Sequence, residues 1–290
     1  MILIAFMTGL LFGVFVNAAA NSLPFRRKLA VPHCYACGAP RQLLAWSGAI
    51  AWISAKRRCL YCDRSILMRE VFVELILVAA AVLLSMANDS FARWLLELLT
   101  VSIFMLIMVI DLEHRLILHV VSVPAALFFA LIGSVDPNLG PSRTLVGGAI
   151  GFVTFLLLYI LGAFFARWMG RRRGEELDEV AFGFGDVMLA LVIGLAVGFP
   201  GVICALLRGI LLAGVFSFVY MLVMAAMKRY EAFTPIPYGP FLILGALWVY
   251  FRGDPAMERL LGYCDLRYFS VTNPYPRPYK SPFWPRGTTG

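Results

Sequence analysis

The sequence predicts an all-α polytopic membrane protein with about eight transmembrane helices and a small four-cysteine, zinc-binding insertion between the first two. Three observations lead to this fold class. Hydrophobic residues make up 61% of the 290-residue chain and charged residues only 14%, with a mean hydropathy of +0.83, which lies outside the range of soluble domains. Long apolar runs recur along the chain, and the largest polar segment between them contains two Cys-x-x-Cys pairs.

The apolar runs supply the expected helices, because about 20 helical residues cross a hydrocarbon core of ~30 Å. The first run has no basic segment before it and no small-residue cleavage site after it, so we expect a retained helix and not a removed signal peptide. The sixth and eighth runs are short for a span. The runs lie at about residues 2–20, 71–87, 93–110, 117–133, 144–166, 186–199, 201–226 and 238–251.

The distribution of Lys and Arg predicts the orientation. With the N-terminus outside, the connecting loops on the cytoplasmic face carry 16 of these residues, and the outer loops carry two, Arg93 and Arg143. The formal charge of +8 therefore reflects topology and contact with anionic membrane lipids, and we expect no nucleic-acid partner. The expected domains are a first transmembrane helix (1–24), a cytoplasmic zinc-binding loop (25–70), a transmembrane core (71–251) and an extracytoplasmic tail rich in Pro and aromatic residues (252–290).

The cysteines of the large loop are expected to hold zinc. Cys34 and Cys37 form one pair, Cys59 and Cys62 form the other, and 21 residues separate the pairs. Two facing turns of this kind make a tetrahedral sulfur cage with Zn–S distances of ~2.3 Å. Disulfides are the alternative, but they are rare in the reducing cytoplasm that this loop is expected to face. Four protein ligands leave no open position for a substrate, so the predicted role of the Zn²⁺ is structural.

Two aspartates stand at the borders of apolar runs. Asp111 ends the third run and Asp186 begins the sixth, and the alternating topology places both at the cytoplasmic edge. An aspartic protease needs two such carboxyl groups, one protonated and one ionised, to share a water that attacks a peptide carbonyl. A single border aspartate could instead cap a helix or pair with a nearby Arg or His. Two at the same depth favour the catalytic interpretation.

Other residues are expected near this pair. Gly183 and Gly185 precede the second aspartate and give a backbone that a substrate strand can approach closely. Glu70 and Glu74 lie one helical turn apart at the entrance of the second span. They either line a polar cavity at the active face or pair locally, and both interpretations stay open.

The segment "PIPYGP" before the last span contains Pro237, Gly239 and Pro240. We expect it to form a rigid cytoplasmic turn near the site, although ending one helix and starting another would by itself justify these residues.

The motifs together resemble a known family. "GFGD" (183–186) looks like the Gly-x-Gly-Asp signature of intramembrane aspartyl proteases. The chain also shows, in order, "GLLFGVFVN" at its start, the paired Cys-x-x-Cys loop, "IDLEHRLI" around the first aspartate and "PIPYGPFLILGA" before the last span. Over about residues 9–250 this order is similar to the bacterial type IV prepilin peptidases.

The resemblance implies a bacterial inner-membrane aspartyl endopeptidase whose catalytic pair is Asp111 and Asp186. Its substrates would be type IV prepilins or pseudopilins, cut at the cytoplasmic face after a glycine that ends a short basic leader. Many relatives then methylate the new N-terminus with S-adenosylmethionine, and the zinc loop accompanies that bifunctional type. No glycine-rich nucleotide loop is visible in the sequence, and the oligomeric state stays open.

Two other classes of protein remain as alternatives. One is an intramembrane protease of the presenilin or signal-peptide-peptidase type, against which stand the cysteine loop, the "IPYGP" turn and Ile110 before the first aspartate. The other is a cation transporter or a zinc-stabilised assembly factor without enzymatic activity. The placement of the aspartates at the membrane border disfavours transport.

Overall fold

All regular elements in the described residues are helices. The computed structural model describes residues 1–26, 31–54, 58–137, 139–173, 183–227 and 237–252, so the predicted tail lies outside the described residues. The only strand-like pairings among these residues are two isolated bridges in the cysteine insertion. In chain order the elements are α1 (Ile2–Arg26), η1 (Leu43–Ala45), α2 (Gly48–Ile53), α3 (Met68–Ala87), α4 (Phe91–His114), α5 (His119–Val135), α6 (Gly140–Arg173), α7 (Phe184–Val197), α8 (Gly201–Ala226) and α9 (Gly239–Arg252).

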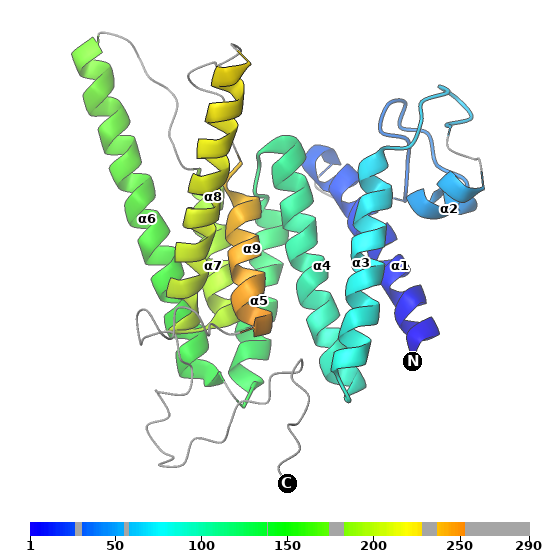
Figure 1. The fold of residues 1–290 in the computed structure, drawn as a ribbon, viewed down its shortest axis with the longest axis horizontal. Helices are drawn as coiled ribbons and strands as arrows, with labels where there is room; N and C mark the ends of the chain where they lie inside the picture. Colours follow the sequence, from blue (N-terminus) through cyan, green and yellow to red (C-terminus); the bar gives the residue numbers. More distant parts are fainter. Residues whose placement is uncertain (27–30, 55–57, 138, 174–182, 228–236, 253–290) are drawn as a thin grey trace. The chain divides into compact units, whose positions relative to one another are not determined.

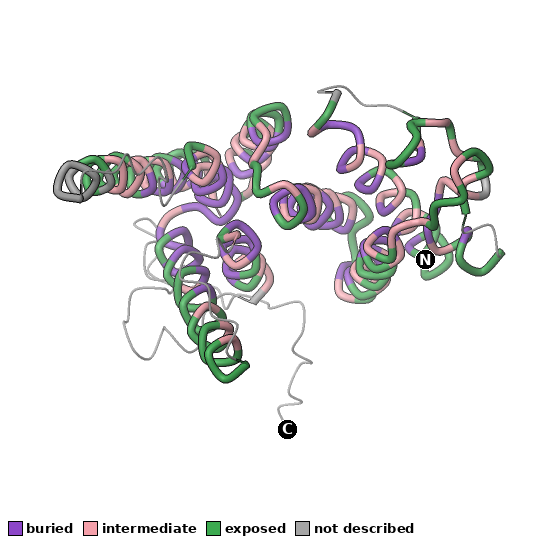
Figure 2. The backbone as a smooth tube through the Cα atoms, turned by 90° about the horizontal axis from the view of Figure 1, so that it is seen from above, coloured by how far each residue is buried: buried purple, intermediate pink, exposed green. Residues whose placement is uncertain are grey.

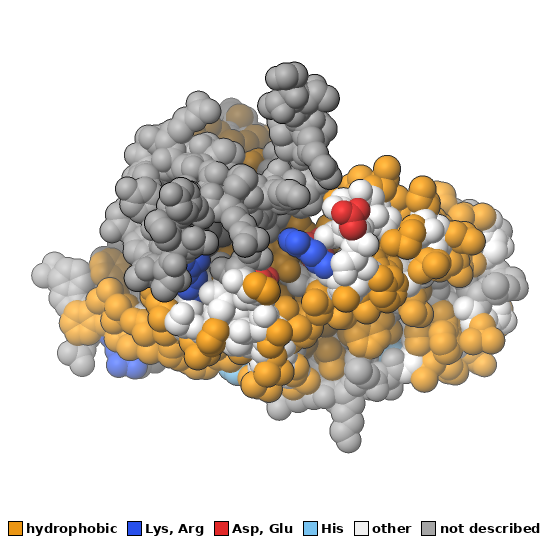
Figure 3. Space-filling model, turned by 90° about the horizontal axis from the view of Figure 1, so that it is seen from below, with side chains coloured by type: hydrophobic (Ala, Val, Ile, Leu, Met, Phe, Trp, Pro, Cys, Tyr) orange, Lys and Arg blue, Asp and Glu red, His pale blue; other side chains and the backbone are white. Residues whose placement is uncertain are grey.

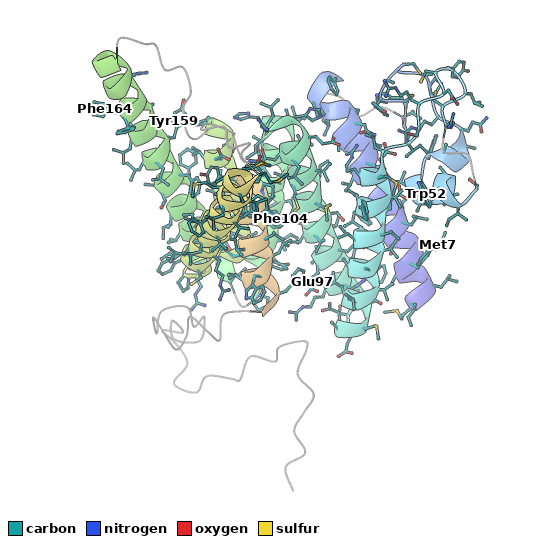
Figure 4. The ribbon with its side chains drawn as sticks, turned by 45° about the horizontal axis from the view of Figure 1, so that its top comes forward. Met7, Trp52, Glu97, Phe104, Tyr159 and Phe164 are labelled. Atoms are coloured by element: carbon teal, nitrogen blue, oxygen red, sulfur yellow. The ribbon has the colours of Figure 1, made fainter. Side chains whose placement is uncertain are left out.

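Each of the eight predicted apolar runs forms a helix, which confirms the all-helical membrane fold. Five helices, α1, α3, α4, α6 and α8, are long and apolar enough to cross a membrane, whereas α5, α7 and α9 are shorter. Exactly eight crossings therefore remain a prediction. Large hydrophobic side chains such as Met7 on α1 and Phe164 on α6 project outward (Figure 4), and hydrophobic side chains form most of the described surface in Figure 3. Such a surface suits contact with lipid tails.

The first of two compact units ends at Ile110, and α1 packs against α3 within it (Figure 1). Two glycines spaced by four residues allow this contact. A Cβ atom added at Gly9 would lie 2.7 Å from Cα of Val78, and one added at Gly13 would lie 2.8 Å from Cα of Glu74. Small residues at this spacing let the backbones of membrane helices approach closely, so the "GLLFG" segment serves packing within the chain.

The second unit begins at Asp111 and is built around α7, which contacts α5, α6, α8 and α9. Nearly every residue of α7 from Val187 to Val197 is buried (Figure 2). Its 14 residues span only about 21 Å, less than a hydrocarbon core. Because protein surrounds it, the short helix does not have to match the thickness of the bilayer by itself.

Glycines also set the contact between α6 and α7. A Cβ atom added at Gly151 would overlap the carbonyl oxygen of Ala190, and one added at Gly194 would overlap the carbonyl oxygen of Gly147. The two backbones therefore touch, and this contact fixes the position of the helix that begins next to Asp186.

We expect Gly151→Ala to destabilise the second unit by about 1–3 kcal/mol, as overpacking of a filled core does. Gly162 is the matched control, because it lies on the same helix and a Cβ added there meets nothing within 4 Å. Gly162→Ala should be neutral or stabilising by up to about 1 kcal/mol. Thermal unfolding of the purified protein in detergent measures the difference, and equal melting temperatures for the two variants would contradict the packing argument.

Candidate active site and metal centre

Asp111 lies in the last turn of α4 and is 5% exposed. Its Oδ2 atom is fully buried and has no hydrogen-bond partner of ordinary geometry among the described residues. A buried carboxyl oxygen without a partner is expensive, so a ligand, a water or a shared proton is expected at this position.

Asp186 lies in the first turn of α7, where the chain enters the helix. Its Oδ2 accepts a hydrogen bond of 3.0 Å from the backbone N–H of Gly183, the residue that caps the helix. The positive end of the helix dipole and this N–H both favour the ionised form of the carboxyl group. The hydrogen bond from Gly183 involves only Oδ2 of Asp186 and not its Oδ1 atom.

Asp111 and Asp186 both belong to the second unit, one at the end of α4 and the other in the first turn of α7. Gly239, the first residue of α9, lies against both supporting helices: a Cβ atom added there would overlap Oδ2 of Asp111 and would lie 3.5 Å from Leu189, one turn beyond Asp186. A single glycine thus lies close both to Asp111 and to the helix that carries Asp186, and the meeting of the two aspartates stays a prediction.

The two glycines before Asp186 have different surroundings. A Cβ atom at Gly185 would lie 2.8 Å from Cβ of Ile117, so the fold itself requires a small residue there. A Cβ atom added at Gly183 would come no closer than 3.9 Å to any atom of the described residues, which leaves space beside the aspartate within that part of the chain. That open space is compatible with the close approach of a substrate backbone.

The "PIPYGP" segment delivers Gly239 to Asp111. Pro240 is buried in the first turn of α9, a position where proline suits a helix because the missing N–H would have no partner there. Pro237 precedes the helix and is partly exposed. The described part of the turn therefore both starts the last apolar helix and contributes to the surroundings of the site.

Glu70 and Glu74 lie in the first unit and are locally paired. Arg41 binds both carboxylate oxygens of Glu70, at 2.6 and 2.9 Å. Glu74 accepts hydrogen bonds from the hydroxyl of Ser47 at 2.5 Å and from the backbone N–H of Gly48 at 2.8 Å. Both acids are at most 1% exposed, and their contacts fasten the insertion to α3. Of the two interpretations left open by the sequence, the geometry favours local pairing.

The four cysteines of the insertion form one cluster. Sγ of Cys34 lies 3.6 Å from that of Cys62, and Sγ of Cys37 lies 3.7 Å from that of Cys59; all four atoms lie within 4.8 Å of one another. A tetrahedron with Zn–S bonds of ~2.3 Å has edges of about 3.8 Å, so the spacing fits zinc. The residues present could hold a metal ion in a closed, four-sulfur site.

Two matching turns present these thiols. The N–H of Gly38 donates to the carbonyl of Cys34 at 2.9 Å, and the N–H of Asp63 donates to the carbonyl of Cys59 at 3.0 Å. Gly38 and Asp63 both have positive φ, at 71° and 55°. The left-handed backbone at the residue after each pair lets each turn fold back on itself, and Gly or Asp tolerates it.

Protonation of the cluster also indicates a cation. Backbone N–H groups of Tyr61 and Cys62 lower the pKa of Cys59 to about 7. A hydrogen bond from the backbone of Arg64 favours the Cys62 thiolate, but desolvation and the neighbouring thiols outweigh it and raise the pKa of Cys62 to about 12. Four crowded sulfurs cannot all ionise without a positive charge between them, which a divalent metal supplies.

The fold and the site define a polytopic helical membrane protein with an aspartate at the end of α4, another at the start of α7, and a four-cysteine insertion. Residues 98–218, which include both aspartates, match the Type IV leader peptidase family, and residues 7–88, which include the four cysteines, match the Bacterial Peptidase A24 N-terminal domain. The chain therefore belongs to the type IV leader peptidase family, as its motifs predicted, and is a peptidase.

Curated relatives agree over nearly the whole chain. A prepilin leader peptidase/N-methyltransferase of Xanthomonas campestris is 24% identical over 89% of this chain and 94% of its own length. A prepilin leader peptidase/N-methyltransferase of Stutzerimonas stutzeri is 26% identical over 91% of this chain and 95% of its own length. A type 4 prepilin-like proteins leader peptide-processing enzyme of Escherichia coli O78:H11 is 28% identical over 78% of each chain. No solved structure matches the chain.

The partners of the buried acids could not be predicted from the sequence. Arg41 and Ser47 carry no motif, and each is separated by more than 25 residues from the glutamate that it binds. The one signal in the sequence was the expense of Glu70 and Glu74 in an apolar segment, which requires a partner without saying which residue provides it.

We expect about one zinc ion per chain by metal analysis of the purified protein, as four thiolates in a closed cage imply. A Cys34→Ser, Cys59→Ser double variant removes one ligand from each turn and should lose the metal and the fold of the insertion. Full zinc occupancy in that double variant would rule the site out.

Gly239→Ala should displace the Asp111 carboxyl group and lower peptidase activity by at least about tenfold, because a misplaced catalytic group loses proximity and orientation. Gly214→Ala on α8 is the control, since a Cβ added there meets nothing within 4 Å. Both variants should fold and retain zinc. Leader cleavage by Gly239→Ala at the wild-type rate would show that the close approach to Asp111 does not matter for the site.

Proposed function

We propose that this protein is a membrane-embedded aspartyl endopeptidase that removes the short basic leader from type IV prepilins or pseudopilins. The observation that carries the proposal is Oδ2 of Asp111, which is buried without an ordinary partner at the end of α4 and lies against Gly239, next to the helix that carries Asp186. The names of the relatives, which process prepilin leaders, supply the substrate class.

The geometry supports a mechanism with two different carboxyl groups. Asp186, at the start of a helix and already accepting a backbone N–H, is the ionised base that takes a proton from water. Asp111, at the end of a helix, is the acid whose proton hydrogen-bonds the peptide carbonyl oxygen. The water oxygen bonds to the carbonyl carbon to give a tetrahedral intermediate, the C–N bond then breaks, and the proton held by Asp186 goes to the leaving amine.

The approach of the substrate follows from the glycines. The open space beside Gly183 admits an extended peptide next to Asp186, while Gly185 and Gly239 keep the surrounding helices close. A scissile bond held in this way is oriented between the two carboxyl groups, which is the main contribution that a rigid site makes to the rate.

We also propose that the zinc has a structural role and that N-methylation follows cleavage. Four cysteines fill a tetrahedral site, so the metal fits the insertion without an open position for chemistry. The relatives are named as N-methyltransferases, which implies S-adenosylmethionine as a second substrate. It would supply a methyl group to the new N-terminal amine.

The proposed location is the bacterial inner membrane, with the insertion and the aspartate pair at the cytoplasmic face. Support comes from the 16 Lys and Arg residues on one set of loops against two on the other. Asp111 ends α4 and Asp186 begins α7, so both belong to helix ends on the same predicted side.

Asp111→Asn and Asp186→Asn should each lower leader cleavage by about 10²–10⁴-fold or more, because an amide can neither accept the proton of the water nor share one. The test is digestion of a purified prepilin, followed by mass measurement of the products. Asp89→Asn, at an exposed position after α3, controls for the change of charge. Wild-type cleavage by either dyad variant in a folded, zinc-loaded protein would return the transporter or assembly-factor interpretation to first place.

A further inference from the structure

The short helix α2 lies beside a membrane helix instead of above it. Its first backbone N–H groups, from Gly48 and Ala49, donate to the carboxylate of Glu74 at 2.8 and 3.0 Å. Glu74 is six residues, or about 9 Å, beyond Met68, the first residue of α3. Since α3 has 20 residues and a length of about 30 Å, it needs all of that length to span the bilayer. The depth of Glu74 therefore places α2 at the boundary of the lipid, and Figure 1 shows it alongside α1 and α3.

The surface of α2 suits that depth. Ile50 is 38% exposed, Trp52 is 44% exposed and Ile53 is 86% exposed, so a six-residue helix presents three large apolar side chains outward. Figure 4 shows Trp52 projecting from this helix. Tryptophan is enriched at membrane interfaces, where the ring is apolar and the N–H is wet.

A cavity of 780 Å³ lies next to α2, between the two cysteine turns. Trp52 and Met68 line it from the two elements at the lipid boundary, and Arg58 and Arg64 line it from the second cysteine turn. The volume falls within the range of small-ligand sites, and the lining combines apolar and positively charged side chains. A ligand for this cavity should therefore have an anionic end and an apolar end.

Two of the arginines are available for such a ligand. Arg41, which also lines the cavity, is held by Glu70. Arg58 pairs with Asp63, but both side chains are about 70% exposed, and such a surface pair contributes little and exchanges readily. Arg64 has no ion pair among the described residues.

The sequence of the insertion supports an anionic partner. Residues 31–68 carry five Lys and Arg residues and one acidic residue. A zinc cage of four thiolates has a net charge of −2, so the insertion keeps a net positive charge when the metal is counted. Basic pockets beside membrane helices on the cytoplasmic side bind the head groups of anionic lipids.

We propose that this cavity binds the head group of an anionic phospholipid, with the phosphate at Arg58 and Arg64 and the acyl chains along the exposed side chains of α2, Trp52 and Ile53. The lipid occupies the gap between the insertion and the bilayer, and it holds the insertion at the membrane surface. The proposal concerns a site in the first unit, so it does not depend on the peptidase activity assigned to the second.

The test uses the full-length, zinc-loaded protein, delipidated in detergent and titrated with phosphatidylglycerol or phosphatidylcholine while native mass spectrometry counts the bound lipid. Phosphatidylglycerol should bind more tightly than phosphatidylcholine. An Arg58→Gln, Arg64→Gln double variant should lose about 10- to 30-fold of the phosphatidylglycerol affinity, as expected for two basic groups near an anionic surface. An Arg93→Gln, Arg143→Gln variant removes the same charge from the predicted outer loops and should bind as wild type does.

A second measurement checks the depth of α2. In bilayers containing brominated lipids, quenching of tryptophan fluorescence should fall when Trp52 is replaced by Phe. Binding and quenching in an Asp186→Asn protein should equal those of the wild type, which separates this proposal from the peptidase. Unchanged lipid affinity in the arginine double variant would overturn it. Displacement of the lipid by millimolar inorganic phosphate or by S-adenosylmethionine would also overturn it and assign the cavity to a soluble ligand.

Discussion

A carboxylate inside an apolar helical protein must have partners, and this constraint organises the whole structure. Four carboxyl side chains are buried in the described residues: Glu70, Glu74, Glu97 and Asp111. An arginine of the insertion binds the first, the backbone of α2 binds the second, and Asn88 donates to the third at 2.7 Å. Of these four carboxyl groups in the described residues, only that of Asp111 keeps a fully buried oxygen without an ordinary partner. The three glutamates with partners hold elements of the fold together. The incompletely paired acid, Asp111, is the one that lies at the candidate active site.

The packing of the second unit explains how that site is kept open and yet rigid. Backbone contact between α6 and α7, made possible by Gly151 and Gly194, fixes the helix that starts beside Asp186. Gly239 brings the start of α9 onto Asp111 in the same way. Side chains of any size at these positions would separate the helices. Among the described residues, Gly183 differs from Gly185 and Gly239 in that a Cβ atom added there would meet no close neighbour.

The insertion depends on two kinds of buried charge. Sulfur atoms crowded within 4.8 Å of one another require a cation, and the metal that they would hold closes two turns that have too few apolar residues to fold alone. Glu70 and Glu74 then attach the insertion to α3 through Arg41 and the first turn of α2. Because these contacts occur within the membrane-facing length of α3, the insertion cannot move far from the lipid surface. The arginine-lined cavity lies where a lipid head group would be expected.

The sequence by itself determined the membrane class, the eight apolar helices and the four-cysteine cluster, and it singled out the two border aspartates as a predicted site. These features are local: hydropathy is read within one segment, two Cys-x-x-Cys turns need only their own spacing, and Asp111 and Asp186 stand out because each borders an apolar run. Only the tertiary structure decided that Glu70 and Glu74 are paired, and that Gly239 lies on Asp111. These facts depend on contacts between residues separated by 26 or more positions, and the expense of a buried charge demands a partner without specifying where in the chain that partner lies.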